Sequence, residues 1–278
     1  MTERYLLNRL LARSGTLLYR LFVYVSILFL LAPLAVIVII SFQSTPYGGW
    51  PPQEFTLSWY TDLPDAVGFL GVTDALAVSI RLAVATAIIS TAIGGLAAFG
   101  LVRSDLESSA LLETLFLSPL IYPWILVGFA ILLFIGQLDA QAGVQISLSF
   151  WTLLLGHVLI TLPFTIRTTT ASLQNFNYSL EEAAQDLGAT ELETYAFVTL
   201  PLIKPGLISG MVFAFVLSFN QYIVSLFLSG PSTLPLRLFD LFFNTPPQQL
   251  AAIGTLLMIG TLAVIAVVEY AVGISRYM

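Results

Sequence analysis

Long apolar runs dominate the chain and predict membrane-spanning helices. A spanning helix needs about 20 mostly apolar residues, and six stretches of more than 20 residues contain no Asp, Glu, Lys or Arg. These stretches are 21–53, 82–102, 114–138, 140–166, 205–236 and 241–268. Trimmed at Gly, Pro and polar residues, they predict helices near 19–42, 76–102, 111–136, 150–173, 206–229 and 250–273.

Two places along this pattern need interpretation. The third and fourth runs meet at Asp139, in a segment that holds two Gly and two Gln, so a short loop at 136–143 is expected. A polar kink in one very long helix is the alternative. The first run is interpreted as a retained helix rather than a signal peptide, because its apolar core is long and no small-residue cleavage site follows.

The segment 1–18 is expected to be cytoplasmic or interfacial, and 19–278 to form the transmembrane domain. Four leucines of this segment fall on one helical face with two arginines nearby: Leu6, Leu7, Leu10, Leu11, Arg9 and Arg13. That arrangement suits a short helix in the headgroup region. An unstructured basic tail is the alternative.

Composition leaves an integral membrane protein as the class. Hydrophobic residues make up 58% and charged residues 9%, with a mean hydropathy of +0.92. A soluble domain carries about a quarter charged residues, so a soluble enzyme and a disordered chain are both excluded. Ten basic residues do not form a nucleic-acid-binding face. The absence of Cys excludes disulfides and thiolate metal sites, and a single His157 excludes a haem with two histidine ligands.

The positive charges fix the expected orientation. With an inside N-terminus and six spans, the inside segments hold eight Lys and Arg residues and the outside segments hold two, Arg81 and Arg237. The inside residues are Arg4, Arg9, Arg13, Arg20, Arg103, Arg167, Lys204 and Arg276. The positive-inside rule therefore predicts that both termini are cytoplasmic.

The most polar stretch, 177–201, then lies inside the cell, between the fourth and fifth spans. Ser179 with Glu182, and Thr190 with Glu193, each have the spacing of a capping box. Gly188 is placed to end the first helix in a left-handed conformation. Leu200-Pro201 should end the second helix. The apolar stripe Leu180, Ala183, Ala184 and Leu187 must bury against the membrane interface or a soluble partner, and the small alanines favour the partner.

The same stretch resembles the EAA loop of ABC importer permeases. That pattern is Glu-Ala-Ala, three residues, Gly, nine residues, and Ile-x-Leu-Pro. This chain has Glu182-Ala183-Ala184, Gly188, and Val198-Thr-Leu200-Pro201 at the same spacing, with Val in place of Ile. The resemblance implies an all-α membrane protein with the type I ABC importer permease (MetI-like) fold, in a cell membrane that it crosses several times.

The resemblance also implies a mechanism and partners. The EAA loop would dock on a cytoplasmic ATPase, and the coupling residues would be Glu182, Ala183, Ala184, Gly188, Leu200 and Pro201. The chain has no Gly-x-x-x-x-Gly-Lys-Ser/Thr motif, so ATP and Mg would bind two separate ATP-binding subunits and this chain would be neither an enzyme nor a cofactor carrier. A second homologous permease, with a homodimer as the alternative, and an extracellular solute-binding protein complete the expected assembly.

Polar residues at membrane depth are candidates for the solute pathway. The fifth span contains Asn220, Gln221 and Tyr222, of which the first two project in different directions, so at most one of that pair is expected to face a cavity. In the third span Tyr122 and Trp124 flank Pro123, at an expected kink. His157 in the fourth span is expected to be a hydrogen-bonded packing residue.

The region 218–235 resembles the second permease of spermidine/putrescine-type importers, which implies a polyamine as solute. An acidic residue often follows Ser-Phe in that group, whereas Asn220 and Gln221 are neutral. Another small organic solute or ferric ion therefore stays open. A secondary transporter that works without ATP is the remote alternative. It would rely on buried charges, of which Glu269 is the clearest acidic example.

Overall fold

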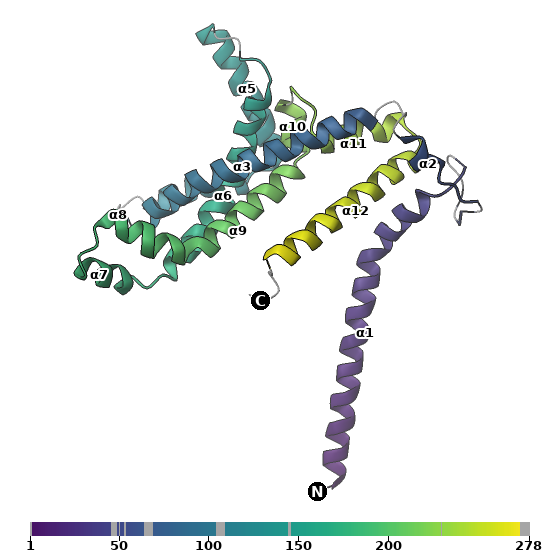
Figure 1. Ribbon diagram of the computed structural model, residues 1–278, viewed down its shortest axis with the longest axis horizontal. Coiled ribbons are helices and arrows are strands. Elements are labelled where there is room, and N and C mark those ends of the chain that lie inside the picture. Colours follow the sequence, from purple (N-terminus) through teal and green to yellow (C-terminus); the bar gives the residue numbers. More distant parts are fainter. Residues whose placement is uncertain are drawn as a thin grey trace. The chain divides into compact units, whose positions relative to one another are not determined.

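The structure is a computed structural model that describes residues 2–45, 49, 51–52, 54–63, 69–103, 109–143, 146–228 and 230–272 (Figure 1). The side chains of the N-terminal leucines and arginines discussed above, and those of Glu269 and Arg276, lie outside this description. The α-helices are α1 (Thr2–Ile40), α2 (Ser58–Thr61), α3 (Phe69–Arg103), α4 (Ser109–Leu117), α5 (Trp124–Ala142), α6 (Phe150–Gln174), α7 (Ser179–Asp186), α8 (Glu191–Thr194), α9 (Leu200–Phe219), α10 (Ile223–Leu228), α11 (Leu234–Asn244) and α12 (Pro247–Val272).

The predicted all-α membrane class is confirmed. Five helices within the described part of the chain are long and apolar enough to cross a membrane: Thr16–Ile40, Gly71–Arg103, Trp124–Gln141, Phe150–Gln174 and Glu191–Phe219. Helix α12 has 26 residues, which is also the length of a span. The expected helices at 76–102, 150–173 and 250–273 correspond closely to α3, α6 and α12.

The chain divides into two compact units, of which the first combines Met1–Phe69 with Asp240–Met278. Here α1 and α12 pack against each other, and the turn after α1 is held by hydrogen bonds. The Trp59 indole donates to the Gln43 carbonyl at 2.8 Å, and the buried Gln248 amide donates to the Thr45 carbonyl at 2.9 Å. Helix α1 is continuous from Thr2 through the first span, so the segment before the span is helical, and its expected position in the headgroup region stays a prediction.

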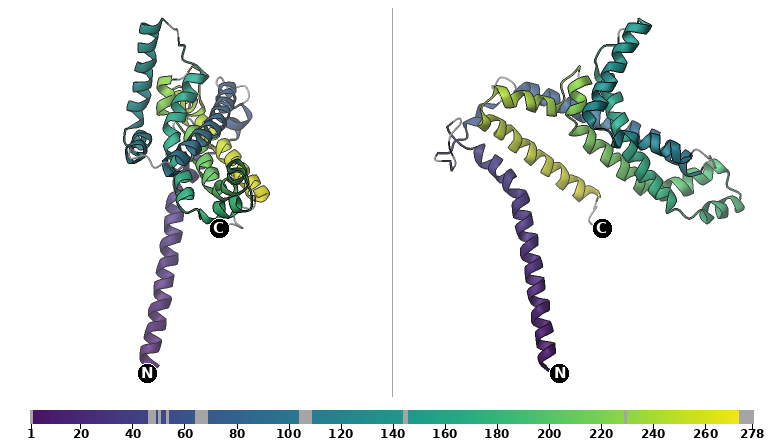
Figure 2. Two further views of the ribbon diagram at one scale, coloured as in Figure 1. Left: turned by 90° about the vertical axis from the view of Figure 1, so that its left-hand side faces the viewer. Right: turned by 180° about the vertical axis from the view of Figure 1, so that it is seen from behind.

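The second unit, Leu70–Phe239, contains the core that positions the candidate sites. Helix α6 packs on α9, and α3 contacts both of them through Ser90, Gly94 and Gly95 (Figures 1 and 2). Helix α10 packs against both α5 and α6. Glycines permit this approach: a Cβ at Gly206 of α9 would lie 2.8 Å from the Thr168 carbonyl oxygen of α6. The buried apolar cluster consists of Leu82, Ile131, Ile135, Leu153, Leu154, Ile160, Val224 and Leu228.

The third span differs from the single helix expected at 111–136. Helix α4 ends at Leu117, a 3₁₀ turn follows at Ser118–Leu120, and α5 begins only at Trp124. Pro123 precedes α5 with an extended ψ of 132°. Proline lacks an N–H and disfavours helical backbone in the residue before it, so two prolines within five residues break the helix rather than kink it.

The loop expected at 136–143 also lies elsewhere. Helix α5 continues through Asp139 to Ala142 and ends at Gly143, which has a φ of +61°. Polar residues are tolerated in the last turn of a helix, whereas a left-handed residue stops it. The Asp139 carboxylate accepts the Ile146 amide at 2.8 Å, which ties residue 146 to the end of α5.

The fifth span is displaced toward the N-terminus relative to the predicted 206–229. Leu200-Pro201 does not end a helix, because α8, a π-helical turn at Tyr195–Thr199, and α9 form one helix from Glu191 to Phe219. The Leu200 amide bonds to the Tyr195 carbonyl, five residues back. This wider turn accommodates the proline that follows. The helix ends instead at Asn220.

Candidate functional site

The EAA-like loop forms a short helix, a glycine turn and the start of a long helix. Helix α7 ends in a Schellman motif: the Ala189 amide bonds to the Ala184 carbonyl at 3.0 Å, and the Gly188 amide bonds to the Gln185 carbonyl at 2.9 Å. Gly188 has a φ of +94°, as the sequence predicted, and a residue with a side chain would be strained there.

One of the two predicted capping boxes is present. Thr190 accepts the Glu193 amide at 3.3 Å, and the Glu193 carboxylate accepts the Thr190 amide at 2.8 Å. The hydrogen bond from the Thr190 backbone, followed by that from its hydroxyl, lowers the pKa of Glu193. The box predicted for Ser179 and Glu182 is wrong.

At the start of α7, the Asn177 side chain performs the role expected of Ser179. Its carbonyl oxygen accepts the Ser179 amide at 3.2 Å and the Ser179 hydroxyl at 2.9 Å. Asparagine two residues before an amide forms this local turn readily. Glu182 is therefore not used as a cap, and its side chain is exposed.

A buried ion pair holds α7 against the transmembrane helices. Glu181, only 8% exposed, pairs with Arg103 at the end of α3 and also accepts the Thr199 hydroxyl from the π-helical turn. The Arg103 guanidinium lies over the ring of Tyr195, 4.8 Å from its centroid. Rings of Phe99 and Tyr178 flank the guanidinium at 5.3 and 5.8 Å.

The sequence reasoning missed both charged members of this anchor. Glu181 stands beside the matched motif and looks like one more surface carboxylate, and Arg103 was counted only as a cytoplasmic positive charge. The available signal was the aromatic spacing: Phe99 lies one turn before Arg103, where a stacked arginine is stabilised.

The opposite side of α7 is exposed. At 100° per residue, Ala183 and Leu187 lie on the side of the helix away from Glu181. Leu187 is 90% exposed and Leu192 of α8 is 78% exposed. We refer to the exposed residues Glu182, Ala183, Leu187, Gly188 and Leu192 as the outer face of the loop. Ala184 is half-buried, and Leu200 and Pro201 are exposed on the long helix that follows.

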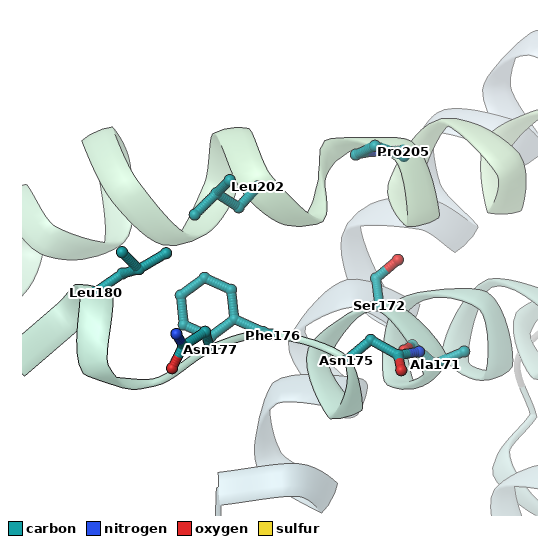
Figure 3. A pocket seen from close by; sticks show the side chains of 8 residues that line it. All are labelled: Ala171, Ser172, Asn175, Phe176, Asn177, Leu180, Leu202 and Pro205. Carbon is teal, nitrogen blue, oxygen red and sulfur yellow. The ribbon is translucent and has the colours of Figure 1, made fainter. Parts of the chain in front are cut away.

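A cleft of about 370 Å³ lies behind the start of α7, between the end of α6 and α9 (Figure 3). Leu180 and Phe176 face Leu202 across it, and Pro205 and Ser172 close the other end. Leu180 therefore lines this cleft, although the sequence pattern placed it in the apolar stripe with Ala183, Ala184 and Leu187.

The predicted pathway residues of the fifth span lie where that span breaks. Asn220 is exposed and donates to the Val216 carbonyl at 2.9 Å. Gln221 is 3% exposed, and its side-chain oxygen accepts the Ile223 amide at 3.1 Å, which caps α10. The Tyr222 ring contacts the Phe239 ring, with centroids 4.9 Å apart. Of the adjacent amides, Asn220 alone projects outward.

The two third-span candidates flank the other break. Tyr122 is 58% exposed, whereas Trp124 packs against the apolar cluster that includes Val224 of α10. Helices α5 and α10 are neighbours, and the Phe129 and Phe227 rings lie 5.9 Å apart. The two breaks therefore come directly before two helices, α5 and α10, that pack against each other.

Titratable side chains are sparse within the spans of this unit. Among the described residues there is no group of three or more His, Asp or Glu side chains that could hold a metal ion. A helical membrane bundle with an anchored loop helix and broken spans is typical of the class of transport permeases.

Comparison with known proteins gives the family. Residues 90–275 match the family described as "Binding-protein-dependent transport system inner membrane component". This chain belongs to that family, and it is therefore a multi-pass inner-membrane permease component of a binding-protein-dependent ABC transport system.

Several curated relatives match over most of the chain. The spermidine/putrescine transport system permease protein PotC of Escherichia coli strain K12 is 30% identical over 240 residues, which cover 85% of this chain and 87% of PotC. The putrescine transport system permease protein PotI of the same strain is 31% identical over 83% of this chain and 82% of PotI. The molybdenum permease ModB of Haemophilus influenzae is 28% identical over 63% of this chain and 81% of ModB.

A solved structure supports the fold. One chain of a bacterial ABC transporter involved in the import of the acidic polysaccharide alginate superposes with a TM-score of 0.65, at 16% sequence identity. The match covers 96% of this chain and 97% of that one. The predicted MetI-like importer fold is thereby confirmed.

Proposed function

We propose that this chain imports a small organic cation of the polyamine class, driven by an ATPase that docks on the outer face of the loop 177–201. The observation that carries the proposal is the different environment of two adjacent glutamates. Glu181 is buried in the anchor with Arg103, while Glu182 and the apolar outer face remain exposed. An exposed apolar patch with a charged rim is typical of a protein-binding surface.

We assign the coupling residues by their match to the EAA pattern, and the exposure of the outer face supports this assignment. The residues that would contact the ATPase are Glu182, Ala183, Ala184 and Gly188. The last three are small and would allow close approach. Leu200 and Pro201 would transmit the movement, because they lie in the helix that continues into the fifth span. ATP and Mg would bind two separate ATP-binding subunits. Both termini would be cytoplasmic, as the positive-inside rule predicts.

The solute class rests on the relatives and on aromatic side chains at the breaks. PotC and PotI are named for spermidine and putrescine transport. Tyr122, Trp124 and Tyr222 could bind ammonium groups by cation–π contacts, which do not need a carboxylate. Asn220 would add a neutral hydrogen-bonding group, whereas Gln221 is buried and caps α10. Another small organic solute, which the neutral side chains at 220 and 221 favour, or ferric ion is the second candidate.

The full assembly would contain a second homologous permease, two ATP-binding subunits and an extracellular solute-binding protein in a lipid bilayer. The test is affinity isolation in mild detergent with mass spectrometry, followed by uptake of labelled spermidine and putrescine into proteoliposomes. Recovery of an ATPase and a second permease with ATP-dependent uptake supports the proposal. Recovery of this chain alone with ion-driven uptake would indicate a secondary transporter instead.

A further inference from the structure

His157 joins the two segments of the broken fifth span. It lies in α6 and is fully buried. Its Nδ1 is 2.8 Å from the Ser218 hydroxyl, in the last turn of α9. Its Nε2 is 3.0 Å from the Ser225 hydroxyl, in α10. One imidazole therefore contacts the chain on both sides of the break at 220–222.

The hydrogen bonds of the neighbours assign the tautomer. The Ser225 hydroxyl donates its one proton to the main-chain carbonyl oxygen of Gln221 at 2.9 Å. Toward the imidazole, this hydroxyl can therefore only accept a hydrogen bond. Nε2 therefore carries the proton and donates to Ser225. Nδ1 is the acceptor, and the Ser218 hydroxyl donates to it. Both ring nitrogens of a neutral imidazole are thus used on the two ends of the break.

The break itself has no proline or glycine to cause it. The segment 218–228 contains neither residue, so its sequence would allow a continuous helix. An interrupted helix at membrane depth leaves amides without partners unless side chains supply them. Gln221 supplies one acceptor for the Ile223 amide, and the pair Ser218–Ser225 is held by His157. An uninterrupted helix is the competing arrangement.

Helix α6 is shaped to hold this contact. A Cβ at Gly156 would lie 2.5 Å from the Leu228 side chain and 3.0 Å from that of Val224, so α10 packs directly on this turn of α6. The His157 carbonyl accepts the Thr161 hydroxyl at 2.8 Å, and Thr161 contacts Ser90 of α3, also at 2.8 Å. The turn of α6 that carries the imidazole is therefore tied to α3, and neither α6 nor α3 breaks at this level.

We propose that His157 is a positioning residue of the solute pathway, whose imidazole holds span five in its broken form and so sets where Asn220 and Tyr222 point. The proposal rests on the proposed function only in that these two side chains line the pathway. Loss of the imidazole shifts span five toward the uninterrupted helix. The side chain of residue 220 then points in a different direction and has different neighbours.

The test uses the natural absence of cysteine in this chain. Asn220→Cys is introduced, and its rate of reaction with N-ethylmaleimide is measured in the complex as isolated in mild detergent. The same rate is measured with His157→Leu, with Ser218→Ala and with Ser225→Ala. His157→Gln, which keeps a donor and an acceptor, is the rescue variant, and Ser209→Cys, an exposed position of α9 away from the break, is the control thiol.

Loss of two interhelical hydrogen bonds should change the rate at residue 220 by about tenfold with His157→Leu. Each serine variant should give part of that change, and His157→Gln should restore most of it, while the control thiol reacts at one rate throughout. Equal rates at residue 220 in all backgrounds would overturn the proposal. If His157→Leu prevents assembly, the two milder serine-to-alanine substitutions decide the question. The outcome is independent of which solute and ATPase the complex uses, which the isolation experiment tests separately.

Discussion

Arg103, the last residue of α3, forms an ion pair with Glu181, the third residue of α7. The two residues are 78 positions apart in sequence, and both are largely shielded from solvent, with side-chain exposures of 22% and 11%. Because Glu181 also accepts the Thr199 hydroxyl, one carboxylate connects the second span, the loop helix and the helix that enters the fifth span.

Removing either charge should loosen the loop without removing its docking surface. Glu181→Gln leaves the Arg103 guanidinium without its charged partner and should destabilise the complex by about 1–3 kcal/mol. Transport should fall while the ATPase still binds. The measurement is thermal unfolding of the purified complex alongside uptake. The charge exchange Arg103→Glu with Glu181→Arg is the partial rescue, and unchanged unfolding in Glu181→Gln would show that the ion pair does not hold the loop.

The adjacent carboxylate should respond in the opposite way. Glu182→Lys lies on the exposed outer face, so folding and insertion should be unaffected, whereas ATP hydrolysis should lose its coupling to transport. Co-purification of the ATPase and solute-stimulated hydrolysis report this. Normal transport in the variant would mean that the outer face is not the docking surface.

Gly188 tests the turn that presents this face. At a φ of +94°, replacement with Val forces a β-branched residue into the left-handed region, at a cost of about 1–2 kcal/mol. Insertion should persist while ATPase binding weakens. Gly188→Asn, which tolerates this conformation better, is the matched control and should retain more binding than the Val variant.

Glycine replacement in two spans should give effects of opposite sign. Gly206→Ala would place a Cβ against Ser172 and the Thr168 carbonyl, whereas nothing lies within 4 Å of a Cβ at Gly100. Alanine in a helix is otherwise favoured over glycine by about 1 kcal/mol. Gly100→Ala should therefore raise the melting temperature and Gly206→Ala should lower it. Equal shifts would argue against close packing of α6 on α9.

Acid should weaken the start of α8. Hydrogen bonds from Thr190 lower the pKa of Glu193 in the folded state. The cap therefore stabilises α8 fully at a pH above 4.5, the ordinary pKa of this group. This stabilisation is lost as the pH falls through the lower pKa of the folded state. Amide hydrogen exchange at residue 193 should accelerate over that range, after correction for intrinsic rates. Thr190→Ala should remove the dependence, and an unchanged profile in that variant would assign the effect elsewhere.

The parts of the fold that depend on one segment could be predicted, and those that depend on several could not. The apolar runs predicted α3 and α6 to within a few residues at most ends, and the backbone requirement at Gly188 was visible from spacing alone. The break after Phe219 depends on Gln221, on two serines and on a histidine in another helix, which no local pattern combines. Glu181 and Glu182 are likewise indistinguishable until α3 brings Arg103 beside one of them.

The π-helical turn that joins the loop to the fifth span has a mechanical consequence. Glu191–Phe219 is one helix of 29 residues, so it is about 43 Å long, with the loop that we propose as the docking surface at one end and Asn220 at the other. A tilt of about 5° at the loop would displace the far end by nearly 4 Å, by the same geometry. A small change in the angle of this helix at the loop is therefore enough to move Asn220 by several ångströms.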